Sequence, residues 1–341
     1  MFIGSIMHAL AYVANYLYLI LIGRIVTGFG LTSFMYSKRY CSDARIVGIR
    51  RRTTLASWLV IGQGFGFSAG PFLGGVLYKI GFGNAVFNGF TSPGWLMAGV
   101  WAIFYFASTF LFTDVERPSP ARNDIPLESP STSSSVAPPN EEEHHSPSRS
   151  QWGVVVCMCW YAMTCFFVLG AWEANIPVYA AVRFNYSPYA SGNFIALGGI
   201  TTFPFLILNV LYARRFQDRT VLTLGSLLGL CGLIIMAVTL GTDSVDFASL
   251  YICWFLVALG FNIASACTYT LLSKQLPPSW NGKMSMAIQY SNYTGRVLGA
   301  VWGGAGVKVG MLAYIGVQIA IVGIGESMRL TLWKKLKAKT G

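Results

Sequence analysis

Three ionisable side chains lie within long apolar segments of this chain. They are Arg24, Glu173 and Arg296. A guanidinium can hold an oxyanion through two parallel hydrogen bonds, so the two arginines favour an anionic ligand. Glu173 could balance such a cation or carry a proton. Charged groups inside apolar spans indicate a substrate or proton path. The alternative is that Arg24 and Glu173 are structural, pairing with the backbone or with each other.

Polar neighbours extend this set around Arg296. Tyr290 and Asn292 precede it in the same apolar segment, and we expect them to line a polar face beside it. Glu326 and Arg329 lie near the end of the last apolar segment. We expect their long side chains to reach water there, without a role in binding.

The sequence lacks the motifs of enzyme, nucleotide-binding and metal sites. The sequence has no nucleophile elbow, phosphate-cradling GK[ST] loop, zinc-ligand spacing or dinucleotide fingerprint. Its 7 cysteines show no metal or disulfide spacing, so we interpret them as buried and unreactive. We therefore expect neither an enzyme nor a metal or cofactor site.

The composition indicates whether these segments lie in water or in lipid. Of 341 residues, 54% are hydrophobic and only 11% are charged, against about 25% charged in soluble domains. The net charge of +11 does not indicate nucleic-acid binding, because Lys and Arg stand in short runs between apolar stretches. The partner that this composition predicts is the lipid bilayer.

A helix needs about 20 apolar residues to cross the hydrocarbon core. Ten candidate spans lie near 1–17, 18–37, 53–79, 93–113, 152–174, 190–212, 220–241, 247–272, 284–305 and 310–332. Alternate connections and the carboxyl-terminal tail collect nearly all Lys and Arg outside the spans, and the other connections hold only Lys79, Arg183 and Lys308. Because cytoplasmic loops are enriched in these residues, both termini are predicted to be cytoplasmic.

The chain is predicted to be an all-α membrane protein with two helical bundles of four and six spans. Residues 1–113 form the first bundle and residues 152–333 the second. Residues 114–151 are rich in Ser, Pro and acid, which predicts a disordered cytoplasmic linker. Residues 334–341 form a basic cytoplasmic tail.

An internal repeat relates the two halves. Residues 66–81 read GFSAGPFLGGVLYKIG and residues 295–310 read GRVLGAVWGGAGVKVG, with five glycines and one lysine aligned without gaps. Repeats in the same direction are expected of halves related by an axis along the membrane normal. We expect the first copy to form a close contact between bundles through Gly66, Gly70, Pro71, Gly74 and Gly75.

Two motifs resemble signatures of the major facilitator superfamily. The segment GRIVTGFG at 23–30 resembles the RxxxGxG signature of the fourth helix, and the segment 62–75, with its GP and GG pairs, resembles that of the fifth. MYSKRYCSD at 35–43 and TSPGWLMAGVW at 91–101 resemble the SPX–major facilitator branch, which includes vacuolar phosphate transporters of plants and related lysosomal facilitators. By this resemblance the first helix matches the third of the family, so its opening pair and the soluble SPX domain are expected to be absent.

The resemblance implies a transporter of a small anion such as phosphate, working by alternating access, with a co-transported proton as one option. Arg24 lies within the fourth-helix signature and would contribute to coupling. A vacuolar or lysosomal membrane is implied, with the plasma membrane as the alternative. Two other functions stay open: a drug or general solute exporter, and a non-transporting membrane scaffold.

Overall fold

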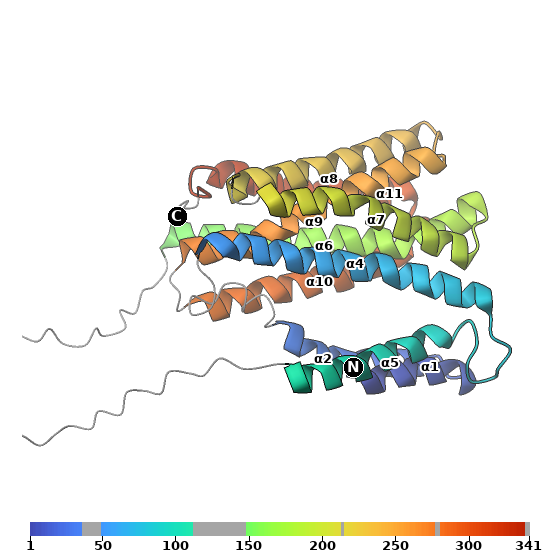
Figure 1. The fold of residues 1–341 in the computed structure, drawn as a ribbon. Helices are drawn as coiled ribbons and strands as arrows, with labels where there is room; N and C mark the ends of the chain where they lie inside the picture. The colour runs from blue at the N-terminus through green and yellow to red at the C-terminus, as the bar shows by residue number, and fades with distance from the viewer. Residues whose placement is uncertain (36–48, 112–147, 213–214, 277–279, 338–341) are drawn as a thin grey trace, which may run out of the picture.

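The computed structural model describes residues 1–35, 49–111, 148–212, 215–276 and 280–337, and its regular structure in these ranges is entirely helical (Figure 1). Before residue 112 the helices are α1 (Phe2–Val13), α2 (Tyr18–Met35), α4 (Ile49–Ile80) and α5 (Ser92–Leu111). After residue 147 they are α6 (Arg149–Phe184), α7 (Pro188–Tyr212), α8 (Asp218–Gly241), α9 (Phe247–Gln275), α10 (Asn281–Val309) and α11 (Met311–Leu332). Each predicted span coincides with one of these helices, which confirms the all-α fold.

Seven helices of the described part are long and apolar enough to cross a membrane, namely α4 to α9 and α11. Helix α1, with 12 residues, and the segment Tyr18–Gly30 of α2 are apolar but shorter. Helix α10 has 29 residues, and its polar residues, Asn292 and Arg296 among them, lower its mean hydropathy. The least apolar long helix is therefore the one that carries most of the predicted binding residues.

The helices lie roughly parallel to one another (Figure 1). The Lys and Arg residues near their termini and in their connections therefore lie at the two ends of the bundle. We call the end where α4, α6, α8 and α10 begin the basic end. It holds Arg51, Arg52, Arg149, Arg215, Arg219, Lys274, Lys283, Lys334, Lys335 and Lys337. In the described part, the opposite end holds Lys79, Arg183 and Lys308.

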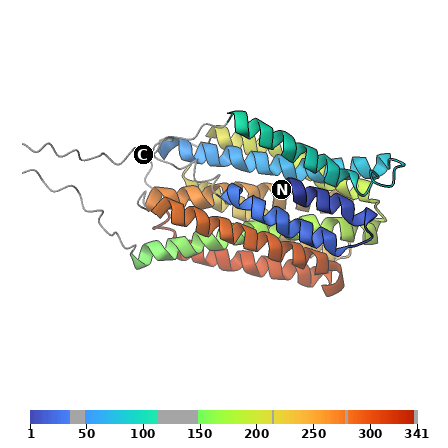
Figure 2. The same cartoon turned by 90° about the horizontal axis from the view of Figure 1, so that it is seen from below.

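The hydrophobic core lies within the helices that follow residue 147. In its most apolar window, α6 is 78% buried, whereas α5 is only 11% buried. Helices α1, α2 and α5 form a layer along one side of the other helices (Figure 1), and the view from below shows α2 passing across α10, which it contacts (Figure 2). Helix α4 lies apart from this layer, packed mainly against α7 and α9. It thus joins the two halves of the chain.

Two long helices begin at side-chain caps. The Ser148 hydroxyl accepts from the Gln151 backbone N–H, and the Gln151 side chain accepts from the Ser148 N–H in return. Helix α6 therefore begins at Arg149, before the expected start of the second bundle at 152. Asp246 and Ser249 form the same reciprocal cap on α9. The rest of the expected linker lies outside the described residues.

The closest helix pairing is that of α6 with α10, and glycines permit it. A Cβ atom on Gly295, Gly299 or Gly303 would collide with the backbone carbonyl oxygen of Met163, Phe167 or Ala171, respectively. Small residues spaced by four allow two helix backbones to approach in this way. The second copy of the repeat is thus the glycine face of α10 that packs on α6.

Candidate functional site

Arg296 and Glu173 form an ion pair across the α6–α10 contact. Both guanidinium Nη atoms donate to the carboxylate, Nη1 to Oε1 at 3.2 Å and Nη2 to Oε2. Arg296 follows Gly295, and its backbone packs against Gly170, one turn before Glu173 on α6. The close helix approach therefore sets the two side chains at the same depth. Their side chains are 27% and 17% exposed, so solvent can still reach a partly buried pair.

Phe67 of α4 covers this pair from the other half of the chain. The Arg296 guanidinium carbon lies 4.1 Å from the centre of the Phe67 ring, a cation–π contact. In the repeat, Phe67 and Arg296 occupy equivalent positions, one residue after Gly66 and Gly295. Helices α4 and α10 also run in the same direction (Figure 1).

Asn292 belongs to the same face of α10, one turn before Arg296. It is 3% exposed, and its Nδ2 donates to Gln289 Oε1 at 2.9 Å. Its Oδ1 has no hydrogen-bond partner among the described residues. Gln289, 5% exposed, was not among the predicted residues; its spacing of three and seven residues from Asn292 and Arg296 could have indicated a shared face. Tyr290 is 59% exposed, and the structure does not bring it to this face.

Arg24 is not part of this ion pair. Its side chain on α2 is exposed and forms no hydrogen bond or ion pair with any residue in the described ranges. Glu173 therefore pairs with Arg296 and not with Arg24. Of the three ionisable candidates, the structure brings two together and leaves the third separate.

The predicted glycine motif of α4 is split by the structure. Gly75 lies against the backbone of Tyr189 on α7, and the Pro71 carbonyl lies next to Gly192 of the same helix. A Cβ atom on Gly66, Gly70 or Gly74 would meet nothing within 4 Å. Only part of the motif thus lies at the contact with α7, and α4 continues unbroken through Pro71.

Cationic side chains join α4 to the other half at both of its ends. Near the opposite end of the bundle, Lys79 Nζ lies 4.6 Å from the centre of the Tyr189 ring on α7. At the basic end, Arg52 is buried and its Nη1 donates to the Ser273 carbonyl of α9 at 3.1 Å. That carbonyl belongs to the last turn of α9, where backbone acceptors need a partner from outside the helix.

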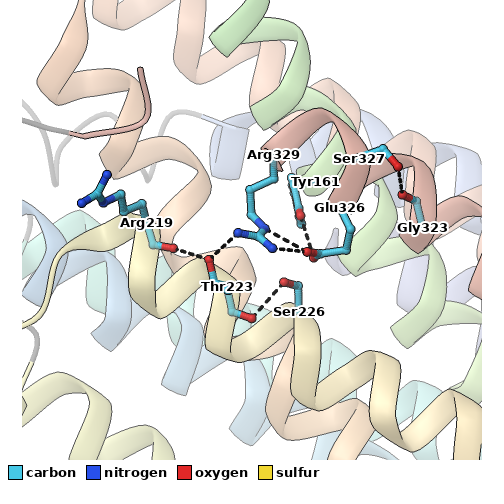
Figure 3. Close-up of polar contacts among 8 residues, drawn as sticks. All are labelled: Tyr161, Arg219, Thr223, Ser226, Gly323, Glu326, Ser327 and Arg329. Atoms are coloured by element: carbon cyan, nitrogen blue, oxygen red, sulfur yellow. Dashed lines mark hydrogen bonds and ion pairs between the residues drawn. The ribbon is translucent and has the colours of Figure 1, made fainter. Parts of the chain in front are cut away.

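A second ion pair lies near the end of α11, and it corrects an expectation. Glu326 and Arg329 do not extend to water: they are 9% and 5% exposed. Arg329 Nε and Nη2 both donate to Glu326 Oε2, at 2.8 and 2.6 Å (Figure 3). Tyr161 donates to Glu326 Oε1 at 2.7 Å, and Arg329 Nη1 donates to Thr223 Oγ1 at 3.0 Å. The side chains turn inward because α6 and α8 supply partners that the sequence alone did not reveal.

The groups around Arg296 can form and break ion pairs with charged partners, but they include no nucleophile. No group of three or more His, Cys, Asp or Glu residues suited to a metal ion occurs in the part of the chain that the structure describes. A guanidinium held by one carboxylate can exchange that carboxylate for another oxyanion of similar geometry. The chemistry that these residues could perform is therefore reversible ion pairing.

Comparisons with known proteins give one family match and several relatives. Residues 1–300 match the family model described as Major Facilitator Superfamily. The chain is 31% identical to an uncharacterized MFS-type transporter of Schizosaccharomyces pombe, over 99% of this chain and 66% of that protein, and 30% identical to another, over 99% and 71%. It thus spans about two thirds of the length of these relatives. An SPX domain-containing membrane protein of Arabidopsis thaliana is 41% identical, over 31% of this chain and 15% of its own length.

Proposed function

This chain belongs to the major facilitator superfamily, and we propose that it carries a small anion across a membrane by alternating access. The family and the names of the relatives indicate a transporter and not an enzyme. The observation that supports the proposal most directly is the Arg296–Glu173 pair under Phe67, because both halves of the chain contribute to it. In a protein whose halves rock about a central site, the substrate binds where the halves meet.

In the proposed cycle, the anion takes the place of Glu173 on the Arg296 guanidinium. The carboxylate competes with the anion while it is ionised, so its protonation frees the guanidinium. A proton and the anion would then be carried together, and the arginine would return to Glu173 once both have left. The contact between Arg296 and Phe67 would change during this exchange, because the guanidinium would shift relative to the ring when a different partner neutralises it. Arg24 stays a second candidate for coupling, from the signature that it matches.

We propose phosphate as the anion. The planar fork of Arg296 suits an oxyanion with several equivalent oxygens, and the motifs at 35–43 and 91–101 resemble the SPX–major facilitator branch. The same resemblance supports a vacuolar or lysosomal membrane. The excess of Lys and Arg at the basic end supports a cytoplasmic position for that end. The even number of predicted spans, with their alternating directions, supports the same side for both termini.

The test is uptake of radiolabelled phosphate by proteoliposomes that contain the full chain. Arg296→Lys keeps the charge and removes the fork, and we expect at least a tenfold loss of uptake. Glu173→Gln should retain uptake but lose its dependence on an inwardly directed proton gradient. The matched control is Arg183→Lys, because Arg183 forms an exposed pair with Asp243 at 2.9 Å, outside the proposed path. Equal losses in Arg183→Lys and Arg296→Lys would contradict the assigned site.

Two further arms separate the alternatives. Uptake of a hydrophobic cation in place of phosphate would identify a drug or general solute exporter. A ligand that binds only the folded protein raises its thermal stability by mass action. The absence of any substrate-dependent stabilisation and uptake would support a non-transporting scaffold and would rule out the proposal.

A further inference from the structure

The start of α8 and the end of α11 meet around Trp333 at the basic end. We call Arg219, Arg329 and Trp333 the Trp333 cluster. The two guanidinium carbons lie 4.8 Å (Arg219) and 5.3 Å (Arg329) from the centre of the indole ring. Arg219 is also held by its own polar contacts: Nη1 donates to the Trp333 carbonyl at 3.3 Å and Nε donates to Gln217 Oε1 at 2.8 Å. Its position is therefore fixed from two sides.

The two arginines differ in their charge balance. The charge of Arg329 is neutralised by Glu326 within the buried network of Figure 3. Arg219 is half-buried and has no carboxylate within ion-pair distance among the described residues. Its backbone carbonyl accepts from Thr223 Oγ1 at 2.7 Å, while its side chain extends away from the network (Figure 3). The network thus anchors the backbone of a cation whose charge is left available.

Other cations lie close to Arg219 and Trp333 in sequence, and none of them forms an ion pair with a residue in the described ranges. Arg215, Lys334, Lys335 and Lys337 are exposed at the same corner. The nearby acid Asp218 is paired with Lys274, the Nζ–Oδ2 distance being 2.7 Å. The corner therefore has a clear excess of positive charge, and it satisfies the density of basic residues that attracts anionic lipid headgroups next to a membrane span.

Exposed apolar side chains lie at the ends of the same helices and in the connection between α7 and α8. Leu330 is 65% exposed on α11 and Tyr212 is 44% exposed at the end of α7, while Phe216 in the connection to α8 is 58% exposed. Exposed aromatic and aliphatic side chains next to cations are the pattern of a membrane–water interface. This corner therefore places the guanidinium of Arg219, which could bind a phosphate, beside apolar side chains that could contact acyl chains.

We propose that the Trp333 cluster, together with Arg215 and the three lysines, binds the headgroup of an anionic glycerophospholipid. Arg219 would hold the headgroup phosphate, and Leu330 and Tyr212 would contact the chains. The lipid would belong to the cytoplasmic leaflet if the basic end faces the cytoplasm, as we have proposed. Because Arg219 is already held in place, binding costs little additional ordering of this side chain. The occupied site would stabilise the contact between α8 and α11.

The test is native mass spectrometry of the full purified chain with equal amounts of phosphatidylserine and phosphatidylcholine. We expect preferential phosphatidylserine adducts. Arg219→Gln should lower the phosphatidylserine affinity about fivefold, the typical contribution of one basic residue near anionic lipid. Arg219→Lys should lose part of this affinity, since it keeps the charge without the fork. Phosphatidylcholine binding should not change in either variant.

The matched control is Lys283→Gln, which removes a cation that stacks on Trp280 at 4.9 Å elsewhere on the basic end. An equal loss of phosphatidylserine affinity in this variant would mean that general charge attraction explains the binding, and it would overturn the proposal. Displacement of the lipid by millimolar inorganic phosphate would do the same, because the site would then recognise free phosphate. A thermal unfolding midpoint of Arg219→Gln within a degree of the parent excludes misfolding as the cause. These measurements need no transport activity, so they stand or fall separately from the proposed function.

Discussion

Replacing equivalent glycines in the two copies of the repeat should have opposite effects on stability. Gly299 and Gly70 are aligned in sequence. A Cβ atom on Gly299 would collide with the Phe167 carbonyl of α6, whereas one on Gly70 would meet nothing within 4 Å. Alanine is therefore expected to separate two helices at the first site and to fill open space at the second.

The magnitude follows from two terms. Alanine in place of glycine inside a helix stabilises by about 0.5–1 kcal/mol. Overpacking costs about 1–3 kcal/mol, and a backbone carbonyl cannot rotate away as a side chain can, so the upper half of this range applies to Gly299. Gly299→Ala should therefore lose about 1–2.5 kcal/mol, and Gly70→Ala should gain about 0.5–1 kcal/mol.

The assay can use the protein's own thiols. Cys157, Cys165, Cys253 and Cys267 are buried and are not joined in disulfides, so a thiol-reactive dye reports their exposure as the detergent-solubilised protein is heated. At roughly 2–4 °C per kcal/mol, the two variants should differ in midpoint by about 3–14 °C. Equal destabilisation by Gly70→Ala and Gly299→Ala would refute the reasoning, because it would mean that both glycine faces are packed.

Three further changes test other contacts. Glu326→Gln or Arg329→Met alone should destabilise by about 3–5 kcal/mol, because each leaves a buried charge unpaired, while the double variant should recover much of this loss in the same thermal assay. Arg52→Gln should weaken the junction of α4 with α9 through the Ser273 carbonyl, by about 1–2 kcal/mol, seen as faster hydrogen exchange in the last turn of α9. The hydrogen bond from the Ser249 backbone N–H lowers the pKa of Asp246, so this cap stabilises α9 above the ordinary aspartate pKa and is lost as pH falls through the lowered value. Asp246→Asn should remove that pH dependence from hydrogen exchange at the start of α9, and an unchanged profile would contradict the assignment of the cap.

The positions of the helices could be predicted from local sequence because the bilayer imposes a length and a composition on each span. The start of α6 was placed late because the reciprocal cap of Ser148 and Gln151 extends the helix beyond its apolar residues. The polar face of α10 was only partly identified, since Gln289 was overlooked and Tyr290 points elsewhere. Helical spacing predicts a shared face, but it does not say which neighbour that face meets.

Partners distant in sequence could not be predicted. Arg24 and Arg296 look alike as arginines within apolar segments, yet only Arg296 lies next to a carboxylate, because the glycines of α10 bring its helix against α6. Glu326 and Arg329 stand near a helix end, where extension to water is the default for such side chains. Tyr161 and other helices supply hydrogen bonds that keep them buried instead.

The sequence by itself determined that this chain is a membrane protein of long apolar helices, that its basic residues gather at one end, and that residues 66–81 and 295–310 are two copies of one motif. These features depend on composition and on local spacing, which need no knowledge of neighbours. Only the tertiary structure decided that the second copy packs on α6 while much of the first has open space beside it, and that Arg296 meets both Glu173 and Phe67. Such pairings depend on which helices approach closely, a property of the whole packed bundle.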